Sequence, residues 1–332
     1  MQEAIQPVIS VIVCTYNQED TIGRTLDSIL RQRCCVPFEI IIGEDASTDR
    51  TCAVCQQYAE QYPGIIRLYA NEHNKGVVDN YFDCILNAKG KYIADLAGDD
   101  EWCDDEKLEK EWACLEHNED VTIVHSAYKC RDEITGAITS SPHKEEGVVD
   151  GRKLLVQILT QTRHPVIHLC TALYRRDVFL KVYHEHTEFF RDNDYPCEDL
   201  QLCFLFAMNG KVAYLDHHTL LYGIGGRSIT NPQAEEKLFR FVKRATQLSY
   251  DLARCFSVED RKLEEYFSYR IYALLMHAFR SHSATLRAEA LECQQTWGVK
   301  LSLKAKCVKF VTSSSILWKM GLKLRGLIIH NS

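Results

Sequence analysis

Short, largely apolar runs alternate with amphipathic segments along the first hundred residues. The apolar runs have the length and flanking residues of buried strands, and they lie at 8–13, 38–42, 65–69 and 92–96. Between them, apolar residues recur at helical spacing and predict helices at about 17–30, 47–62 and 77–88. This alternation predicts an α/β fold, with a single mostly parallel twisted sheet flanked by helices.

Polar side chains follow three of these strands, at the point where each strand ends. The three clusters are Thr15, Tyr16 and Asn17; Glu44 and Asp45; and Asp99 and Asp100. Ligands of open α/β sheets bind at the carboxyl ends of the strands. An aromatic ring can stack on a nucleobase, a carboxylate can accept a hydrogen bond from a base, and paired carboxylates suit Mg²⁺ or Mn²⁺ with a diphosphate.

Each cluster also has a purely structural interpretation. Tyr16 can be a packing residue, Ser47 or Thr48 can cap the helix that follows, and the acidic pair can belong to a solvated loop that continues through 104–106. Polar clusters at three strand ends favour a ligand site over three separate coincidences.

Beyond residue 103 the pattern is less regular. It predicts strands at 121–125 and 168–174 and a helix at about 151–160, and we interpret the polar stretch 130–149 as a flexible loop over the site. His164 and His168 stand alone and are interpreted as ordinary hydrogen-bonded histidines. Glu198 and Asp199 open an apolar helix, either as ordinary first-turn acids or as functional groups.

Composition bears on the compartment. The 332 residues include 15 cysteines, and no apolar run approaches the roughly 20 residues that span a bilayer. With no signal-peptide pattern at the N-terminus, we expect a cytoplasmic protein with reduced, mostly buried thiols. Cys52 and Cys55 form a C-x-x-C without a second pair at zinc-site spacing, so we interpret them as helix packing.

The net charge of −7 is unevenly distributed. From residue 293 onward the chain carries seven Lys and Arg and no acid, so residues 1–292 hold 32 basic and 46 acidic side chains, a charge of −14. Segment 300–329 is either a basic amphipathic helix on an anionic membrane surface or a terminal helix docked on the protein. Its predicted apolar face comprises Leu317, Met320, Leu324 and Ile328.

Several motifs together resemble the family 2 glycosyltransferases. They are ISVIVCTYN at 9–17, EDASTDRT at 44–51, NKG at 74–76, GKYI at 90–93 and GDDEW at 98–102. The resemblance runs in order over about residues 8–230. It implies a GT-A fold, a nucleotide-sugar donor, a divalent cation, Mn²⁺ or Mg²⁺, and inversion at the anomeric carbon.

The resemblance also implies roles for individual residues. Tyr16 and Asp45 match residues that hold the donor's base, Asp99 the ribose-side acid and Asp100 the metal-side acid, with Asp99 as a second metal ligand. The remaining candidate donor-binding residues in these motifs are Thr15, Asn17, Glu44 and Lys75. Asp199 matches the catalytic base of the family's acceptor-facing acidic pair, with Glu198 as its neighbour or substitute.

Three positions depart from the family's pattern. Ala97 stands where many relatives have an acid, and Gly223 and Gly225 stand where Arg and His are usual in a segment that can reach the diphosphate. Arg227 is the candidate substitute, and the glycines favour a mobile lid.

The expected organisation is a glycosyltransferase domain at 1–232 and a helical extension at 233–332. Residues 1–103 form the nucleotide-binding half and 104–232 the acceptor half. The expected enzyme is a hexosyl- or N-acetylhexosaminyltransferase that moves a sugar from a nucleotide-diphosphate sugar, with uridine as the expected base. The expected acceptor is a glycan or glycolipid of surface polysaccharide biosynthesis, and no nucleic-acid partner is expected. The alternative from another class is a non-catalytic nucleotide-sugar-binding protein, whereas a nucleotidyltransferase would carry a basic Gly-rich loop after the first strand.

Overall fold

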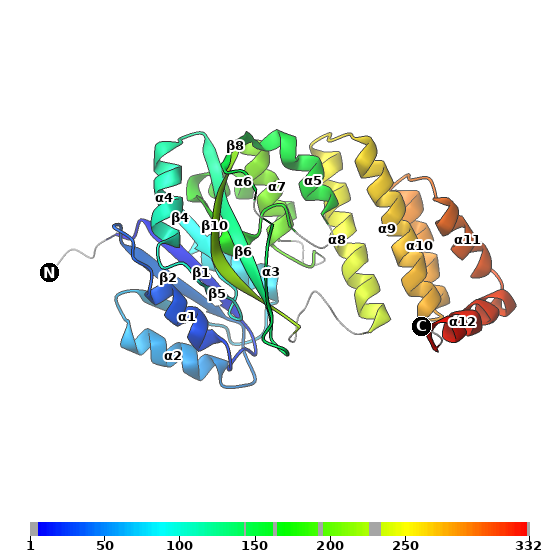
Figure 1. Cartoon of the computed structure of the whole chain (residues 1–332), viewed down its shortest axis with the longest axis horizontal. Helices are drawn as coiled ribbons and strands as arrows, with labels where there is room; N and C mark the ends of the chain where they lie inside the picture. The colour runs from blue at the N-terminus through cyan, green and yellow to red at the C-terminus, as the bar shows by residue number, and fades with distance from the viewer. Residues whose placement is uncertain (1–5, 143, 162–164, 192–194, 226–233, 331–332) are drawn as a thin grey trace. The chain divides into compact units, whose positions relative to one another are not determined.

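The computed structural model describes residues 6–142, 144–161, 165–191, 195–225 and 234–330. Its backbone divides into two compact units, residues 1–193 with 197–227 and residues 194–196 with 228–332. The first unit has an α/β fold with one mixed sheet, and the described part of the second unit is helical (Figure 1).

The amino-terminal half of the sheet is parallel, as the alternation of strands and helices predicts. Its strands are β1 (Ile9–Thr15), β2 (Phe38–Glu44), β3 (Ile66–Ala70) and β4 (Tyr92–Asp95). Strand β1 lies between β2 and β4, and β3 pairs with the far side of β2. Parallel pairing brings the carboxyl ends of β1, β2 and β4 to the same edge of the sheet.

Both faces of these strands are covered, which explains why their sequences are almost continuously apolar. The connecting helices are α1 (Ile22–Leu30), α2 (Thr51–Gln61) and α3 (Val77–Leu86). Val11 and Val13 share a buried core with Leu26 of α1 and Cys55 of α2. On β2, a Cβ at Gly43 would lie 2.5 Å from the sulfur of Cys84, so α3 packs closely there.

The carboxyl-terminal half of the sheet mixes strand directions. It adds β5 (Glu101–Trp102), β6 (Val121–Asp132), β9 (Leu173–Arg175) and β10 (Lys211–Ile224). From β4 the strand order continues β9, β6, β10, β5. Strand β9 is antiparallel to β4 and β6, β10 is parallel to β6, and β5 is antiparallel to β10.

Two predictions for this half are wrong. The stretch 130–149 is not a loop over the site, because it forms the end of β6 and the strands β7 (Ile138–Ser140) and β8 (Gly147–Asp150), which pair with β6 and β10. The strand predicted at 168–174 is a 3₁₀ turn (Leu169–Thr171) followed by the short β9. In both places the partner strand, which is distant in sequence, decides the conformation.

The remaining helices of the first unit surround the second half of the sheet. They are α4 (Lys107–His117), α5 (Leu155–Thr160), α6 (Arg176–Glu185) and α7 (Asp199–Asn209), with 3₁₀ turns at Gly151–Leu154 and Thr187–Phe189. The helix predicted at 151–160 is confirmed as a 3₁₀ turn that continues into α5. Helix α7 packs against α5 and α6.

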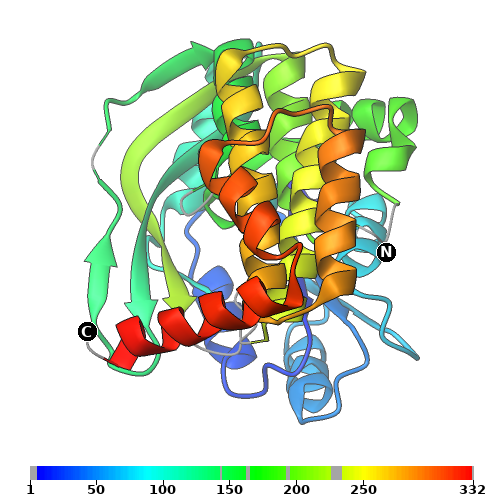
Figure 2. The same ribbon diagram turned by 90° about the vertical axis from the view of Figure 1, so that its right-hand side faces the viewer.

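The second unit is built from helices. They are α8 (Glu235–Cys255), α9 (Arg261–Arg280), α10 (Ala284–Thr296), α11 (Leu303–Val311) and α12 (Ser315–His330). Helix α9 lies between α8 and α10 (Figure 1), and buried residues of α8, α9 and α10 form one core. Helix α12, drawn in red, runs across the direction of these helices (Figure 2). Among the described residues, no helix has both the length and the apolar character needed to cross a membrane.

The cysteines confirm one expectation and correct another. All 15 are free thiols, and Cys52 and Cys55 lie in α2 as helix-packing residues. The expectation that most thiols are buried is wrong, because only four are buried; these are Cys55, Cys84, Cys203 and Cys293. Cysteine is small enough to occupy half-exposed positions along strand and helix edges, and composition alone cannot distinguish these from core positions.

Candidate active site

The loops that follow β1 and β2 are joined by hydrogen bonds between their main chains and side chains. The amide of Asn17 donates to Oγ of Ser47 at 2.9 Å, and the amide of Thr48 donates to Oδ1 of Asn17 at 2.8 Å. Asn17 has a φ of 53°, a conformation that asparagine tolerates better than most residues. The cap predicted at Ser47 or Thr48 is therefore wrong: α2 begins at Thr51, and both residues bind the β1 loop instead.

Tyr16 and Thr15 differ in accessibility. The Tyr16 ring is 43% exposed, and it makes no hydrogen bond with any described residue. Thr15 is buried, and its hydroxyl donates to Oε1 of Gln18 at 2.8 Å. An exposed ring at the end of β1 leaves a flat apolar face for a ligand to stack on.

Asp45 is buried and holds the segment before α3. Its Oδ1 accepts from the amide of Lys75 at 2.8 Å, and its Oδ2 accepts from the amide of Gly76 at 2.9 Å. Glu44, also buried, accepts from the amide of Ser47 at 2.7 Å. The Lys75 ammonium group pairs with Asp83 at 3.1 Å. Asp45 therefore fixes the position of the 74–76 segment, whatever else it binds.

Hydroxyl groups of the α1 segment hold the acidic loop between β4 and β5. Thr21 donates to the carbonyl of Gly98 at 2.8 Å, and Thr25 donates to the carbonyl of Asp100 at 2.7 Å. Further along the helix, Ser28 accepts from the amide of Trp102 at 3.1 Å. These residues recur along one face of α1, so the helix determines where the acidic pair lies.

Asp100 is a buried carboxylate with incomplete hydrogen bonding. Its Oδ1 accepts from the amide of Gly223 at 3.1 Å, whereas its Oδ2 is buried and has no partner among the described residues. Burial and the neighbouring charge of Asp99 raise the pKa of Asp100 well above its usual range. Burial also raises the pKa of the half-buried Asp99.

These observations fit a divalent cation. An uncompensated buried carboxylate oxygen destabilises the folded protein, and a second carboxylate beside it increases the penalty. A hard cation removes both effects, because it needs oxygen ligands and offsets the negative charge. The donor set at Asp99 and Asp100 is therefore suited to Mg²⁺ or Mn²⁺.

The segment that contains Gly223 and Gly225, where the sequence departs from the family's pattern, is partly a strand. Gly223 belongs to β10, which pairs with β6, so the prediction of a mobile lid is wrong for residues 221–224. A Cβ at Gly223 would lie 2.9 Å from Oε1 of Glu133, so a larger residue would need this carboxylate to move. Gly225 has a φ of 83°, which favours glycine. Arg227 lies outside the described residues.

Arg24 is a basic residue beside the acidic pair that the sequence did not single out. It lies in α1 and donates to the carbonyl of Asp99 at 3.0 Å and to Oε1 of Glu133 at 2.9 Å. Its only sequence signal was its place near the start of the first helix, where charged residues are common. Its position depends on how α1 packs, which is a tertiary property.

Glu198 and Asp199 lie at the start of α7, as predicted, and both are half-buried. Burial, together with the charges of Asp199 and Asp95, raises the pKa of Glu198 to about 8. Glu198 is therefore protonated more readily than an ordinary carboxyl group. A carboxyl with a pKa near neutrality is suited to proton transfer.

Asp95, at the end of β4, is a third acid that sequence reasoning missed. It is 4% exposed, accepts from the Tyr81 hydroxyl at 2.8 Å, and has a buried Oδ2 without a partner among the described residues. Burial raises its pKa to about 7. The available signal was a charged residue inside the apolar run 92–96.

The charges of acids from β4, the β4–β5 loop and the start of α7 act on one thiol, that of Cys170. Burial raises the pKa of Cys170, and the charges of Asp100, Asp95 and Glu198 raise it further. Interactions between charges weaken as their separation grows. Asp100 and Glu198 thus both act electrostatically on the Cys170 thiol.

Comparison with known families agrees with this arrangement. The model of the family described as glycosyl transferase family 2 matches residues 10–183, which is more than half of the chain. The chain belongs to this glycosyltransferase family. The expected GT-A-like fold is also confirmed, by solved structures that match most of the chain.

Two of those structures come from different organisms. TarS of S. aureus, residues 1–349 in complex with UDP-GlcNAc, has a TM-score of 0.53 and 17% identity, over 89% of this chain and 93% of that 1–349 chain. Mannosyltransferase PcManGT of Pyrobaculum calidifontis, in complex with GDP-Man and Mn²⁺, has a TM-score of 0.56 and 16% identity, over 96% of this chain and 87% of that one. At these identities the likeness concerns the fold.

Relatives found by sequence match shorter segments. The putative glycosyltransferase EpsE of Bacillus subtilis is 35% identical over 43% of this chain and 51% of its own length. The putative teichuronic acid biosynthesis glycosyltransferase TuaG of the same species is 39% identical over 32% of this chain and 41% of its own length. The chain thus matches about half or less of the length of these relatives.

Proposed function

We propose that this glycosyltransferase moves a sugar from a nucleotide-diphosphate sugar to an acceptor hydroxyl, with inversion at the anomeric carbon. The observation that supports this most strongly is the buried Asp100 with its unpartnered Oδ2 beside Asp99. A non-catalytic binding protein has no need of both this uncompensated acidic pair and a Glu198 carboxyl whose pKa is about 8.

Asp100 and Asp99 hold the divalent cation in this proposal. When bound, the cation supplies Lewis-acid stabilisation of the negative charge that develops on the departing nucleoside diphosphate. Arg24 adds a fixed positive charge next to the Asp99 main chain. In the relatives an arginine at the position of Gly223 is usual, and Arg24 is this chain's candidate replacement.

Asp199 is the proposed general base, and Glu198 its neighbour or substitute. In an inverting transfer the base takes the proton of the acceptor hydroxyl while that oxygen attacks the anomeric carbon. The exposed Tyr16 ring stacks on the donor's base. Asp45 lies on the buried side of the loops that follow β1 and β2. The remaining donor contacts come from Thr15, Asn17, Glu44 and Lys75, and Asp99 binds the ribose.

The donor is proposed to be a UDP-sugar and the transferred unit a hexose or N-acetylhexosamine. The acceptor is a glycan or lipid-linked glycan of a bacterial surface polysaccharide. Support for this class comes from TuaG, whose name refers to teichuronic acid biosynthesis, and from TarS, solved with UDP-GlcNAc.

Donor turnover with the Asp199→Asn variant tests the proposal. A panel of UDP- and GDP-sugars with Mn²⁺ identifies the donor, and removal of the base should lower the rate by roughly 10²–10⁴. Glu198→Gln in parallel decides which acid is the base. Binding of UDP with Mn²⁺ and no turnover of any donor would favour the non-catalytic alternative, and a fully active, folded Asp199→Asn variant would reject the assigned base.

We also propose that the second unit attaches the enzyme to the cytoplasmic face of a membrane. Helices α11 and α12 expose four large apolar side chains among lysines, and we call this set the tail surface: Leu303, Phe310, Ile316 and Met320 with Lys304, Lys306, Lys309, Lys319 and Lys323. The opposite side of these helices packs through Ala305 and Trp318, whose indole donates to the carbonyl of Phe279 at 3.0 Å. The tail is therefore docked and still presents a basic, apolar face.

Sedimentation with vesicles tests the tail surface. Each lysine near an anionic bilayer contributes about 1 kcal/mol, and this attraction weakens with salt. We expect the wild type to bind vesicles with anionic lipid at low salt and Phe310→Ser with Ile316→Ser to bind less. Tyr269→Ser, which removes another exposed ring of this unit, is the control. If the double variant and the Tyr269→Ser control both sediment like the wild type, the tail surface is not the membrane contact.

A further inference from the structure

The thiol of Cys170 lies next to the acidic pair and has no role in the proposed function. Cys170 belongs to the 3₁₀ turn Leu169–Thr171, which packs against β4. The Trp102 indole donates to the carbonyl of Cys170 at 2.9 Å, and Trp102 follows Asp100 by two residues. The turn is therefore held against the loop that carries Asp99 and Asp100.

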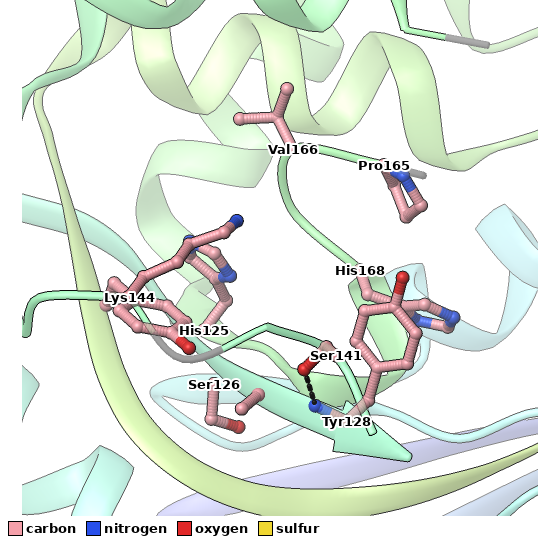
Figure 3. Close-up of a pocket in the computed structure, with 10 residues that line it drawn as sticks. His125, Ser126, Tyr128, Ser141, Lys144, Pro165, Val166 and His168 are labelled. Atoms are coloured by element: carbon pink, nitrogen blue, oxygen red, sulfur yellow. Dashed lines mark hydrogen bonds between the residues drawn. The ribbon is translucent and has the colours of Figure 1, made fainter. Parts of the chain in front are cut away.

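Aromatic rings fix the segment that precedes Cys170. The His168 ring contacts the rings of Tyr128 and Tyr222, whose centroids lie 5.0 and 4.9 Å away. Figure 3 shows His168 beside Tyr128, where both line a cavity of about 20 Å³ that has room for about one water molecule. The residue after Tyr222 donates its amide to Asp100 at 3.1 Å. Close packing thus sets the position of the Cys170 thiol relative to Asp100.

The electrostatics of the acidic pair agree with this placement. Burial raises the pKa of Asp100 most, and hydrogen bonding from the Cys170 thiol acts against that rise. Burial and the charge of Asp100 raise the pKa of Cys170, whereas hydrogen bonding from the main chain of Ala97 acts against that rise. The sulfur is therefore close to both the Asp100 carboxylate and the main chain of Ala97.

Ala97 gives this contact its chemical meaning. Many relatives have an acid at this position, whereas the alanine side chain offers no ligand atom. Asp100 is 1% exposed, and its buried Oδ2 has no partner among the described residues. Buried polar atoms are nearly always paired, so this oxygen indicates an ion. The Cys170 sulfur supplies the third donor atom that Ala97 does not.

We infer that Cys170 is a third protein ligand of the cation that Asp99 and Asp100 hold, and that its sulfur selects a transition-metal ion over Mg²⁺. The thiol releases its proton to solvent when the sulfur binds the cation, because the thiolate is the ligand. Thiolates bind transition-metal ions well, whereas Mg²⁺ takes oxygen ligands. The inference rests on the proposed function, because that function assigns a cation to the acidic pair.

Absorption spectroscopy with Co²⁺ tests the inference. A thiolate bound to Co²⁺ gives charge-transfer bands in the near ultraviolet, which oxygen ligands do not give. Co²⁺ is titrated into the whole reduced protein in the presence of UDP, and we expect these bands in the wild type. Loss of a residue that merely supports a metal ligand costs about 10–100-fold in metal affinity. Cys170→Ser should therefore lose the bands and weaken Co²⁺ binding by about tenfold or more.

Matched variants identify the source of the bands. Burial and the charge of Asp100 also raise the pKa of Cys130 in β6, so Cys130→Ser is the control and should retain the bands. Asp100→Asn should lose the bands although every thiol is present, which excludes thiols elsewhere as their source. Cys170→Ser should still bind Mg²⁺ with UDP, because the serine hydroxyl is an oxygen donor, and this binding shows that the variant is folded.

Three results would overturn the inference. They are the absence of the bands in the wild type, bands that persist in Cys170→Ser or Asp100→Asn, and bands that only Cys130→Ser removes. Donor turnover with Mn²⁺ is measured on the same samples. If the bands depend on Cys170 and Asp100 but no donor is turned over, only the proposed function is rejected. An active enzyme whose bands do not depend on Cys170 rejects only the inference.

Discussion

Replacement of Asp100 by asparagine tests whether the acidic pair is built for a cation. The substitution keeps the acceptor for the Gly223 amide and removes a buried negative charge whose Oδ2 has no partner. Each unit by which burial raises the pKa of a carboxyl in the folded protein costs about 1.4 kcal/mol of stability at a pH where the unfolded carboxyl is ionised. Without metal, we therefore expect Asp100→Asn to unfold at higher temperature than the wild type, by roughly 2–12 °C for a domain of this size.

The pH dependence of this gain has a definite sign. The folded protein holds the Asp100 proton to a pH well above the ordinary value of 3.8. Wild-type stability therefore falls as pH rises above that value, whereas asparagine does not titrate. The stability difference between the variant and the wild type should be large at pH 7 and disappear in acid.

Thermal unfolding in EDTA and in Mn²⁺ with UDP is the assay. A ligand at 100 times its Kd stabilises the folded state by about 2.7 kcal/mol. We expect this gain in the wild type and its loss in Asp100→Asn. Asp105→Asn, at an acid whose side chain is 42% exposed and pairs with Arg31 at 3.6 Å, should resemble the wild type. If Asp100→Asn is less stable than the wild type in EDTA, or responds equally to Mn²⁺ with UDP, the cation site is refuted.

Three further predictions concern the same region. Gly98→Ala places a Cβ 2.8 Å from the hydroxyl of the buried Thr15 and should cost about 1–3 kcal/mol in urea unfolding. Thr25→Val leaves the buried carbonyl of Asp100 without its donor at 2.7 Å and should cost about 1–3 kcal/mol in the same assay. Burial raises the pKa of Glu198 from 4.5 to about 8, so the wild type should lose stability relative to Glu198→Gln as pH rises through that interval.

Each of these predictions has a control within the chain. Gly64→Ala adds a Cβ with no atom within 4 Å, and equal losses for Gly98→Ala and Gly64→Ala would contradict the steric argument. The exposed Thr139→Val should change stability by no more than about 0.5 kcal/mol. A Thr25→Val variant as stable as Thr139→Val would mean that the hydroxyl does not hold the acidic loop. Parallel pH profiles of wild type and Glu198→Gln would show that Glu198 titrates normally.

The sequence by itself determined the parallel half of the sheet and the location of the acidic pair. Strands such as β1 and β2 are buried on both faces, so their apolar character is continuous and readable without knowledge of their neighbours. The motifs at Thr15, Glu44 and Asp99 follow these strands directly in the chain. Parallel pairing then brings them to one edge, as the alternation of strands and helices predicts.

Tertiary structure decided what depends on partners distant in the chain. Strands β7 and β8 form only by pairing with β6 and β10, so a polar stretch that resembles a loop becomes part of the sheet. Asp95 and Arg24 reach the acidic site through the packing of β4 and α1, and Gly223 contributes through a main-chain amide that every residue type except proline has. Local patterns encode backbone preference and burial, but long-range pairing sets which polar groups meet.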